Sequence, residues 1–367
     1  MTDQEYMLRA IQLAKKGEGW TNPNPMVGAV IVKDGKIIGE GYHKKYGELH
    51  AERNAIASLT ESAEGAVIYV TLEPCCHHGK TPPCTEAIIE QKIRKVVIGS
   101  RDPNPKVAGK GVQMLREAGV TVVEDFMREE CDQLNPVFFH YITTKTPYVV
   151  MKYAMTLDGK IATKTGASKW ITGEAARKEV QHMRHQYMGI MAGIGTVLAD
   201  DPMLNVRVEG WKSPVRIVCD SKLRIPPDSQ IVKSAEKYRT IVAYADQKNT
   251  EEKIKILHTM GVETIYCPDE KNQIDLKKLM TDLGSKGIDS ILLEGGGTLN
   301  DSALRAGIVK EVQAFVAPKL FGGVAGKTPV EGIGVEFPSE AVELKCTDIC
   351  QIGEDIRIKC QVCRKKQ

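Results

Sequence analysis

The sequence contains no long hydrophobic run. Nowhere in its 367 residues does an apolar stretch approach the length of a membrane span, which is about 20 residues. Its first residues, Met1 to Glu5, lack the basic segment followed by an apolar segment that marks a secretory signal. We therefore expect a protein with no membrane partner that works in the cytoplasm.

A surplus of one charge is also missing. The 50 Lys and Arg residues nearly balance the 47 Asp and Glu residues, so the formal net charge is only +3 at pH 7, and the cations are dispersed. This distribution gives no electrostatic footprint for a long polyanion, so we expect no nucleic-acid partner, whereas small phosphorylated substrates stay compatible. The ten cysteines are scattered along a chain without a secretory signal, which favours reduced thiols and metal ligands over disulfides.

The length predicts two domains. In the first, Met7, Leu8, Ile11 and Ala14 recur at helical spacing, and strand and helix signals then alternate as far as a last predicted helix at residues 126–139. This αββαβαβα order is typical of a three-layer sandwich of helices and a sheet.

A polar connector at residues 143–147 marks the boundary. We therefore expect domains at 1–145 and 146–367. In the second domain short apolar runs alternate with helical or turn segments, which predicts an α/β fold. These runs lie at residues 148–154, 189–193, 215–219, 240–244, 262–266, 290–293 and 312–316.

An imidazole, two thiols and a carboxylate form the most informative motif. We interpret His50, Cys75 and Cys84 as ligands of a catalytic zinc and Glu52 as its proton carrier, the arrangement of the zinc-dependent nucleobase deaminases. Zinc with three protein ligands keeps a position for water and lowers its pKa to roughly 7. Residues two apart on a regular helix point roughly 200° apart, so His50 and Glu52 must lie at the irregular start of a helix.

A closed structural zinc site is the alternative. There Cys76, His77 or His78 would be the fourth ligand, and Glu52 would have no role. Near the C-terminus, Cys346, Cys350, Cys360 and Cys363 could form a second zinc site, but the residues between them predict a β-hairpin around residues 353–355.

Two glycine runs suggest phosphate contacts. Residues 193–196 and 294–300 each follow a predicted strand, where backbone N–H groups unshielded by side chains bind anions well. Neither run contains Gly-x-Gly-x-x-Gly, and ordinary turns are the alternative interpretation.

Both halves of the chain resemble one family. The Cys-x8-Cys spacing with His-Gly-Lys-Thr-Pro-Pro inside it resembles the deaminase half of the bifunctional deaminase/reductase family of riboflavin synthesis, the RibD/RibG type. Residues 152–162, 166–172 and 193–204, with the glycine run that begins at Glu294, resemble its reductase half. The resemblance implies a cytidine-deaminase-like three-layer α/β/α domain followed by a dihydrofolate-reductase-like α/β domain, with one zinc ion per chain, NADPH as cofactor, and a homo-oligomer.

The resemblance also implies roles for individual residues. Contacts to the deaminase substrate fall at Asn24, His43, His77, Lys80, Asp102 and Asn104. Cofactor contacts fall at Ala154, Trp170, Thr196, Asp200, Ser221, Gly296, Gly297, Thr298, Leu299, Asn300, Asp301 and Ser302. Contacts to the reductase substrate fall at Lys152, Ser168, Arg184, Leu204, Arg207 and Glu294.

Some of these residue types have plain alternatives. Guanidinium groups at Arg184 and Arg207 suit a ribose 5-phosphate, yet an arbitrary Arg is usually a solvated surface charge. Trp170 could fill a core, and Asn24 and Asp102, which lie next to prolines, could simply form turns.

The predicted function is two consecutive steps of riboflavin synthesis. Hydrolytic deamination of a diaminopyrimidinone ribosylamine phosphate gives a uracil, and NADPH then reduces its ribosyl group to ribityl. One alternative is a nucleic-acid adenosine or cytidine deaminase, which would leave the second domain unexplained. Another is a zinc-stabilised binding module without turnover, in which Glu52 is only a carboxylate favoured at a helix N-terminus.

Overall fold

The chain folds into two compact units, Met1–Lys145 and Thr146–Gln367. The structure is a computed structural model that describes residues 1–78, 82–104, 107–248, 250–324 and 326–363. In these described residues, no helix combines the length and the apolar character needed to cross a membrane.

The first unit is built on a five-stranded sheet with the order β2-β1-β3-β4-β5. Its strands are β1 (Gly28–Lys33), β2 (Lys36–Tyr42), β3 (Val67–Leu72), β4 (Lys95–Ser100) and β5 (Thr121–Val123). Its helices are α1 (Asp3–Lys15), α2 (Ala51–Ala57), α3 (Cys84–Glu90), α4 (Lys110–Glu117), α5 (Arg128–Asp132) and α6 (Pro136–Thr144). Strands β1 and β2 form a hairpin whose two turn residues are Asp34 and Gly35. Both have positive φ, as two-residue hairpin loops of this kind require.

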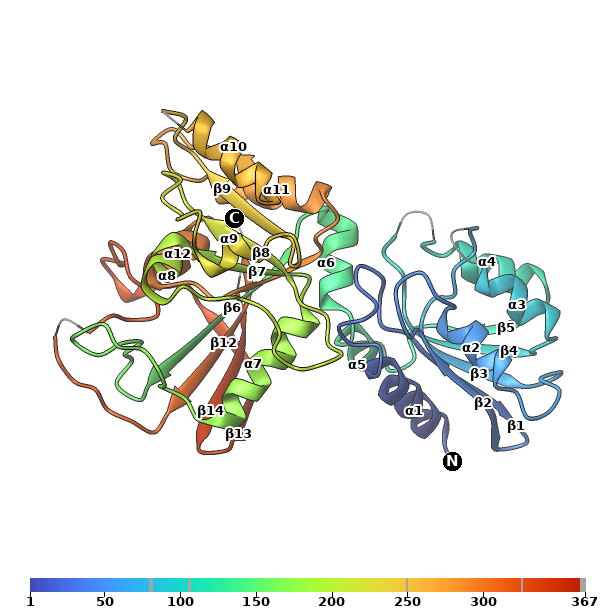
Figure 1. Cartoon of the computed structure of the whole chain (residues 1–367). Helices are drawn as coiled ribbons and strands as arrows, with labels where there is room; N and C mark the ends of the chain where they lie inside the picture. The colour runs from blue at the N-terminus through green and yellow to red at the C-terminus, as the bar shows by residue number, and fades with distance from the viewer. Residues whose placement is uncertain (79–81, 105–106, 249, 325, 364–367) are drawn as a thin grey trace. The chain divides into compact units, whose positions relative to one another are not determined.

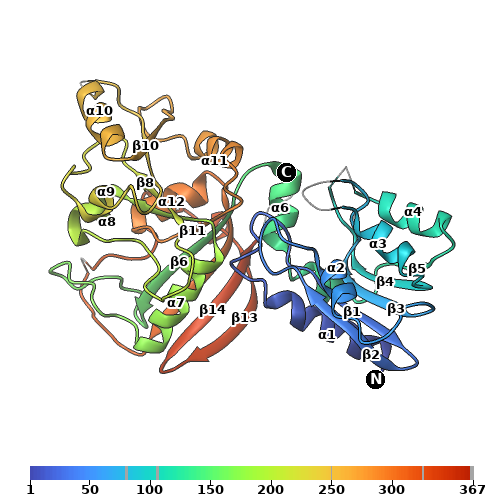
Figure 2. The same cartoon turned by 45° about the vertical axis from the view of Figure 1, so that its right-hand side comes forward.

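Helices cover both faces of this sheet (Figure 2). Buried residues of α1 and α5 pack with Val30, Val32 and Tyr69 on one face. Residues of α2, α3 and α4 pack with Ala29 and Ile31 on the other. The predicted three-layer sandwich is therefore confirmed.

Two details of the prediction for this unit are wrong. The single helix expected at residues 126–139 is two helices, α5 and α6, because Pro136 begins α6 at a position where its missing N–H costs nothing. Leu8, expected on the apolar face of α1, is 44% exposed, whereas Tyr6 and Ala10 are buried.

The second unit contains a nine-stranded sheet with the order β10-β9-β8-β7-β11-β6-β12-β14-β13. Its strands are β6 (Tyr148–Thr156), β7 (Gly189–Gly193), β8 (Val215–Cys219), β9 (Thr240–Tyr244), β10 (Val262–Tyr266), β11 (Ser290–Leu293), β12 (Val309–Ala317), β13 (Leu344–Ile352) and β14 (Asp355–Val362) (Figure 1). Its helices are α7 (Glu174–Gln186), α8 (Ile194–Asp200), α9 (Gln230–Lys233), α10 (Glu251–Thr259), α11 (Leu276–Ser285), α12 (Gly297–Arg305) and the 3-10 turn η1 (Pro338–Glu340).

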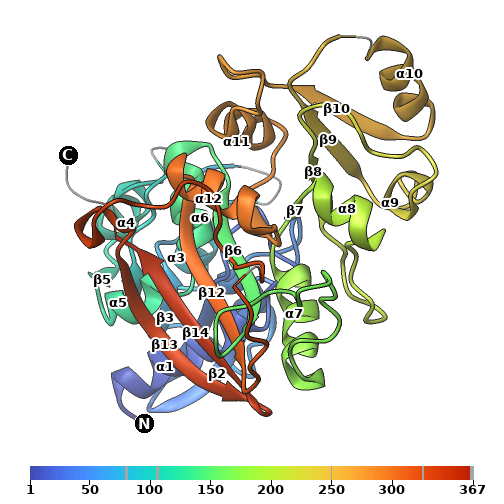
Figure 3. The same ribbon diagram turned by 90° about the vertical axis from the view of Figure 1, so that its left-hand side faces the viewer.

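Two hydrophobic cores lie on opposite faces of this sheet. One contains buried residues of α11 and α12, and the other contains residues of α8, α9 and α10. Figure 3 shows α11 and α12 on one side of the strands and α8 and α9 on the other. The seven apolar runs of the sequence all became strands of this sheet, as predicted.

The C-terminal cysteines lie on the predicted hairpin. Strands β13 and β14 pair antiparallel with Cys346 opposite Cys360. Their Sγ atoms are 2.7 Å apart, and among the described residues the only group of three or more metal-ligand side chains lies elsewhere. The alternative of a second zinc site is therefore not supported in the described part of the chain.

Close packing of α1 on β1 makes a prediction about Gly28. A Cβ atom there would fall inside contact distance of the Ala10 carbonyl oxygen and 2.8 Å from the Ala14 nitrogen. We expect Gly28→Ala to reduce the free energy of unfolding by about 1–3 kcal/mol, the usual cost of overpacking. Urea denaturation measures it. Gly195→Ala is the control, because nothing lies within 4 Å of a Cβ at that residue; equal stabilities of the two variants would contradict the prediction.

Candidate active sites

Three segments bring the predicted zinc ligands together. His50 has extended backbone angles as the N-cap of α2, Cys75 follows β3, and Cys84 begins α3. The His50 Nδ1 atom lies 3.5 Å from the Sγ atoms of both cysteines. One ligand atom from each residue lies within 4.8 Å of the others. The expected irregular helix start is thus present, and it lets His50 and Glu52 face one site.

Backbone contacts fix the two cysteine turns. The N–H groups of Cys84 and Thr85 donate to the Cys75 carbonyl at 3.0 and 3.2 Å. The Arg53 guanidinium donates to the carbonyls of Pro82 and Pro83 at 3.0 and 2.8 Å. The proline-containing segment before Cys84 is therefore tied to α2, the helix that begins next to His50.

The electrostatics of this cluster favour a metal-binding thiolate. The Cys84 thiol and, next, the His50 ring hydrogen-bond to Cys75 and lower the pKa of its thiol to about 4, although burial opposes them. Burial and, secondly, the nearby Cys75 charge raise the pKa of Glu52, whose side chain is 3% exposed. Two thiols and an imidazole match the ligand set of catalytic zinc sites with three protein ligands. The residues present therefore fit zinc.

The closed structural site is not supported in the described residues. The metal-ligand group there consists of His50, Cys75 and Cys84 without a fourth member. His78 is largely exposed and lies 3.4 Å from Glu86, and His77 lines a cavity next to the cluster.

That cavity has a volume of about 320 Å³ and contains Glu52 in its wall. Five of the six residues expected to contact the deaminase substrate line it, namely Asn24, His43, His77, Asp102 and Asn104. The sixth, Lys80, lies outside the described residues. The Asn24 amide is 3.3 Å from the His43 Nε2 atom, and the His43 Nδ1 atom is 3.1 Å from the Leu49 carbonyl. Because a carbonyl only accepts, Nδ1 carries the proton and Nε2 accepts from Asn24.

Asp102 both forms a turn and faces the cavity. Its carboxylate accepts the Asn104 N–H at 2.8 Å, as the turn interpretation predicted. Burial raises the pKa of Asp102 to about 6. The carboxyl group can therefore change its charge close to neutral pH.

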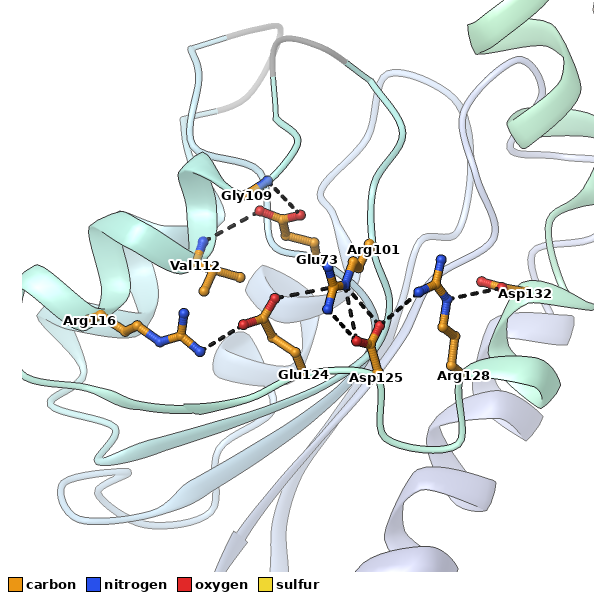
Figure 4. A network of polar contacts seen from close by, with 9 residues as sticks. All are labelled: Glu73, Arg101, Gly109, Val112, Arg116, Glu124, Asp125, Arg128 and Asp132. Carbon is orange, nitrogen blue, oxygen red and sulfur yellow. Dashed lines mark hydrogen bonds and ion pairs between the residues drawn. The ribbon is translucent and has the colours of Figure 1, made fainter.

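Sequence reasoning missed Glu73 and the wall contributed by α6. Glu73 is buried, and its carboxylate accepts the N–H groups of Gly109 at 3.1 Å and Val112 at 3.4 Å (Figure 4). It thereby fixes the start of α4 behind the cavity. Phe138, Tyr141 and Ile142 of α6 also line the cavity, and only their helical spacing in the sequence could have suggested a shared face.

A charged network beside this cavity holds the strand ends (Figure 4). Arg101 at the end of β4 pairs with Glu124 and Asp125, and Arg128 connects Asp125 to Asp132. Exposed pairs of this kind are screened by solvent and contribute little to stability. These pairs hold the segment that follows β4, and Asp102 of the cavity wall comes directly after Arg101 in that segment.

The second unit contains a buried cluster of three charges. Arg184 donates from Nε and Nη2 to the two carboxylate oxygens of Glu294 at 2.8 and 2.9 Å and from Nη1 to the Asn205 carbonyl at 3.1 Å. The Lys152 Nζ atom lies 3.9 Å from Glu294. Burial lowers the pKa of Lys152. Burial raises the pKa of Glu294, but the charges of Arg184 and Lys152 outweigh burial and lower this pKa to about 2.

Arg184 is therefore not the solvated surface charge of the alternative interpretation. Three of its five N–H groups are already engaged within the protein. Arg207 is exposed, and its backbone N–H donates to the Gln181 side chain at 2.8 Å. Leu204 is buried with a positive φ of 47°.

A larger cavity of about 710 Å³ lies in the second unit. Predicted contact residues in its wall are Ser168, Thr196, Asp200, Ser221, Gly296, Gly297, Thr298, Leu299 and Ser302. Nothing lies within 4 Å of a Cβ built on Gly195 or Gly296, so a ligand can approach the backbone there. The glycine loops and this volume fit a dinucleotide cofactor.

Four other predicted cofactor residues lie outside this wall. Asn300 is fully buried, and its amide donates to the Pro329 carbonyl at 2.8 Å. Asp301 pairs with Arg305, and Ala154 lies on β6. Trp170 is 59% exposed, with the Arg177 guanidinium 4.7 Å from its ring centre, so it does not fill a core. The cavity wall also includes three cations that the sequence did not single out: Lys222, Arg224 and Lys327.

Comparison with known proteins assigns a family to each half. Residues 1–100 match the cytidine and deoxycytidylate deaminase zinc-binding region, and residues 147–358 match the RibD C-terminal domain. These matches confirm the predicted fold class, a deaminase-like domain followed by a dihydrofolate-reductase-like domain. They also place a zinc-binding region where His50, Cys75 and Cys84 meet.

Relatives match along nearly the whole chain. The riboflavin biosynthesis protein RibD of Actinobacillus pleuropneumoniae is 58% identical over 97% of this chain and 94% of its own length. The structure of Acinetobacter baumannii RibD superposes with a TM-score of 0.89 at 39% identity, covering 99% of each chain. A Thermotoga maritima diaminohydroxyphosphoribosylaminopyrimidine deaminase/5-amino-6-(5-phosphoribosylamino)uracil reductase superposes with a TM-score of 0.87 at 39% identity, covering 98% of each chain. The chain therefore belongs to the RibD family of bifunctional enzymes, which carry out a deaminase and a reductase step of riboflavin biosynthesis.

Proposed function

We propose that each unit performs one of the two steps. Residues 1–145 hydrolyse 2,5-diamino-6-(5-phosphoribosylamino)pyrimidin-4-one to 5-amino-6-(5-phosphoribosylamino)uracil and ammonia. Residues 146–367 then reduce the ribosyl group to ribityl with NADPH. The observation that carries the first assignment is the buried Glu52 carboxylate in a cavity beside His50, Cys75 and Cys84.

Glu52 moves the protons of the deamination. Zinc held by His50, Cys75 and Cys84 supplies Lewis-acid activation of water. Glu52 takes a proton from the attacking water and returns it to the amino group on C2 of the pyrimidine, which leaves as ammonia. The raised pKa of Glu52 suits this role, because a general acid-base group works best when its pKa lies closer to the working pH.

The cavity wall orients the pyrimidine. Asn24, His77 and Asp102 surround the space next to Glu52 and offer both hydrogen-bond donors and acceptors. The orientation of His43, set by Leu49, leaves Asn24 fixed by its contact with the ring. Lys80 and Asn104 complete the proposed substrate contacts.

In the second unit the protein orients two bound molecules. NADPH supplies the hydride for C1 of the ribose, and the glycine loops that begin at Gly193 and Gly296 hold its pyrophosphate. Thr196, Asp200 and Ser221 line the same cavity. The remaining proposed cofactor contacts are Ala154, Trp170 and residues 297–302.

The buried charges select the substrate of the reduction. We propose that the Lys152 ammonium donates to the pyrimidine carbonyl created by deamination, so that the reductase prefers the deaminated compound. Glu294, fixed by Arg184, holds Lys152 in place. Ser168, Leu204 and Arg207 provide further contacts to the ribose phosphate.

The rival functions explain less of the molecule. A nucleic-acid deaminase leaves the cavity and glycine loops of the second unit without a purpose. A binding module without turnover gives no reason for a buried Glu52 facing a cavity. We further propose that the chain acts in the cytoplasm as a homo-oligomer, which light scattering of the purified protein can contradict by giving a monomer mass.

Glu52→Gln tests the proton carrier. The amide cannot shuttle protons, so we expect ammonia release to fall by a factor of about 10²–10⁴, the usual contribution of a general acid-base group. Zinc content and unfolding temperature should stay at the wild-type values. Glu90→Gln on the exposed end of α3 is the control. Equal rates in wild type and Glu52→Gln would remove Glu52 from the mechanism.

Lys152→Ala tests substrate selection in the reductase. Without the ammonium, we expect the preference for the deaminated over the diamino pyrimidine, measured as the ratio of kcat/KM values, to fall about 10-fold or more. Lys178→Ala, an exposed residue of α7, is the control. An unchanged ratio in Lys152→Ala would refute the assignment.

Arg184→Met tests the buried ion pair. Removing one partner leaves a buried carboxylate, and we expect a loss of about 3 kcal/mol in unfolding free energy at pH 7. In the wild type the lowered pKa of Glu294 gives stability that is present above the unfolded pKa and is lost as the pH falls towards 2. In the variant the Glu294 pKa rises. The difference in unfolding free energy between wild type and variant should therefore shrink as the pH falls towards 4.

Denaturant unfolding at several pH values measures this dependence. Arg305→Met, which breaks the pair between the exposed Arg305 and the half-buried Asp301, is the control and should cost less than about 1 kcal/mol. A loss in Arg184→Met that does not vary with pH would mean that Glu294 is not the group responsible.

A further inference from the structure

Two cysteines lie opposite each other at the outer edge of the sheet of the second unit. Strand β13 is the last strand of this sheet, next to β14 (Figure 3). Cys346 on β13 pairs in register with Cys360 on β14, and their Sγ atoms are 2.7 Å apart. Residues paired in an antiparallel ladder have Cα atoms about 4.5–5.5 Å apart, inside the range of about 4.4–6.8 Å that a disulfide spans. A bond between the two thiols therefore needs no rearrangement of the strands.

The other cysteines of this unit are placed differently. Cys219 and Cys267 are buried, so reagents in solution do not reach them. Cys350 lies opposite an arginine of β14, and Cys363 is exposed just beyond the end of that strand. Among the described strand pairs of this unit, only the pair of β13 with β14 places two cysteines opposite each other.

The two opposed thiols differ in exposure. Cys346 is exposed, whereas Cys360 is 5% exposed and has Val312 of the apolar core on its other side in the ladder. Burial and, secondly, the contact with Cys346 raise the pKa of the Cys360 thiol to about 11. The contribution of Cys346 to this pKa disappears once its sulfur is bonded. Cys346 is therefore the thiol that meets an oxidant, and Cys360 is positioned to react with it afterwards.

The pair joins a weakly held strand to a firmly held one. Of the nine residues of β13, seven are exposed and two are half-buried, so none is fully buried. Strand β14 pairs with β12 on its other side. Its Asp355 accepts the Gly173 N–H at 2.7 Å, and its Arg357 donates to Glu179 of α7 at 2.7 Å. An edge strand with few buried contacts opens locally at low free energy, and a covalent bond to β14 would oppose that opening.

We propose that Cys346 and Cys360 are a redox modification site, which low-molecular-weight disulfides such as glutathione disulfide convert from two thiols into one cross-strand disulfide that clamps β13 to β14. A reducing compartment keeps such a pair as thiols, and disulfides formed there are usually transient and redox-sensing. The clamp therefore closes only when oxidised disulfides accumulate.

The oxidation takes place in two exchange steps. The Cys346 thiolate attacks one sulfur of glutathione disulfide, forms a mixed disulfide and releases one glutathione thiolate. The Cys360 thiol then loses its proton to the solvent, attacks the Cys346 sulfur and displaces the second glutathione. The two cysteines are oxidised by two electrons, and one glutathione disulfide is reduced to two molecules of glutathione. The second step is favoured because the ladder already holds the two sulfurs next to each other.

Thiol mapping of the zinc-loaded full chain tests the modification site. The chain is equilibrated with glutathione buffers of increasing oxidised fraction, quenched with acid and mapped by mass spectrometry without reduction. In wild type we expect a bond between Cys346 and Cys360, with the loss of two hydrogen atoms. Cys360→Ser should stop at a glutathione adduct on Cys346, and Cys346→Ser should leave Cys360 as a free thiol. Cys350→Ser is the control and should form the bond as wild type does.

Hydrogen exchange of the backbone amides tests the clamp. We expect the amides of β13 to exchange about 10-fold or more slowly in the oxidised than in the reduced chain, because the bond opposes local opening of the strand. Dithiothreitol should restore the faster exchange. Cys360→Ser in the oxidised buffer should exchange at the reduced rate. The amides of β9, whose five residues are all buried, should not change.

Each other outcome overturns the proposal. A glutathione adduct that persists on Cys346 of wild type would show that Cys360 does not react with it. A bond between Cys360 and Cys363, a bond between two chains, or thiols that stay reduced in every buffer would also contradict the assigned pair. A bond between Cys346 and Cys360 that leaves exchange in β13 unchanged would contradict the clamp.

Discussion

The meeting of one imidazole and two thiols at the end of β3 is the constraint on which the first unit depends. His50, Cys75 and Cys84 belong to three segments, and each must start or end at the right residue for their ligand atoms to lie within 4.8 Å of one another. The extended backbone of His50 before α2 satisfies this requirement and also brings Glu52 to the same site. The fold of this unit can therefore be understood as the support for one coordination geometry beside one carboxylate.

The second unit follows a different rule with a similar result. Parallel neighbouring strands end at the same edge of the sheet, and the loops after β7, β8 and β11 form one cavity wall there. The buried charges of Lys152 and Glu294 lie on β6 and directly after β11, at one side of these strands, and the exposed cations Lys222 and Arg224 follow β8 at the other. In the first unit the candidate catalytic residues surround one small cavity. In the second unit the candidate binding residues follow the ends of several neighbouring strands, which suits a long cofactor beside a separate substrate.

Much of this arrangement was predictable from the sequence, because it depends on local patterns. Alternating apolar runs predicted the strands, and the spacing of His50 and Glu52 predicted an irregular helix start. Outside the zinc motif, contacts between distant residues were not predictable. The Arg184–Glu294 pair joins residues 110 apart, and Glu73 contacts an N–H group 36 residues away. Pro136 was visible, but its use as a helix start depends on the packing of α6.

The central claim is that two separate sites act in a fixed order, and NADPH oxidation by the metal-free chain tests it most directly. After removal of zinc with a chelator, the chain should oxidise NADPH with 5-amino-6-(5-phosphoribosylamino)uracil at the normal rate. It should not do so with the diaminopyrimidinone precursor until zinc is restored. Oxidation with both compounds in the absence of zinc would contradict the order of the steps. Oxidation with neither, in a chain that is still folded, would contradict the independence of the two sites.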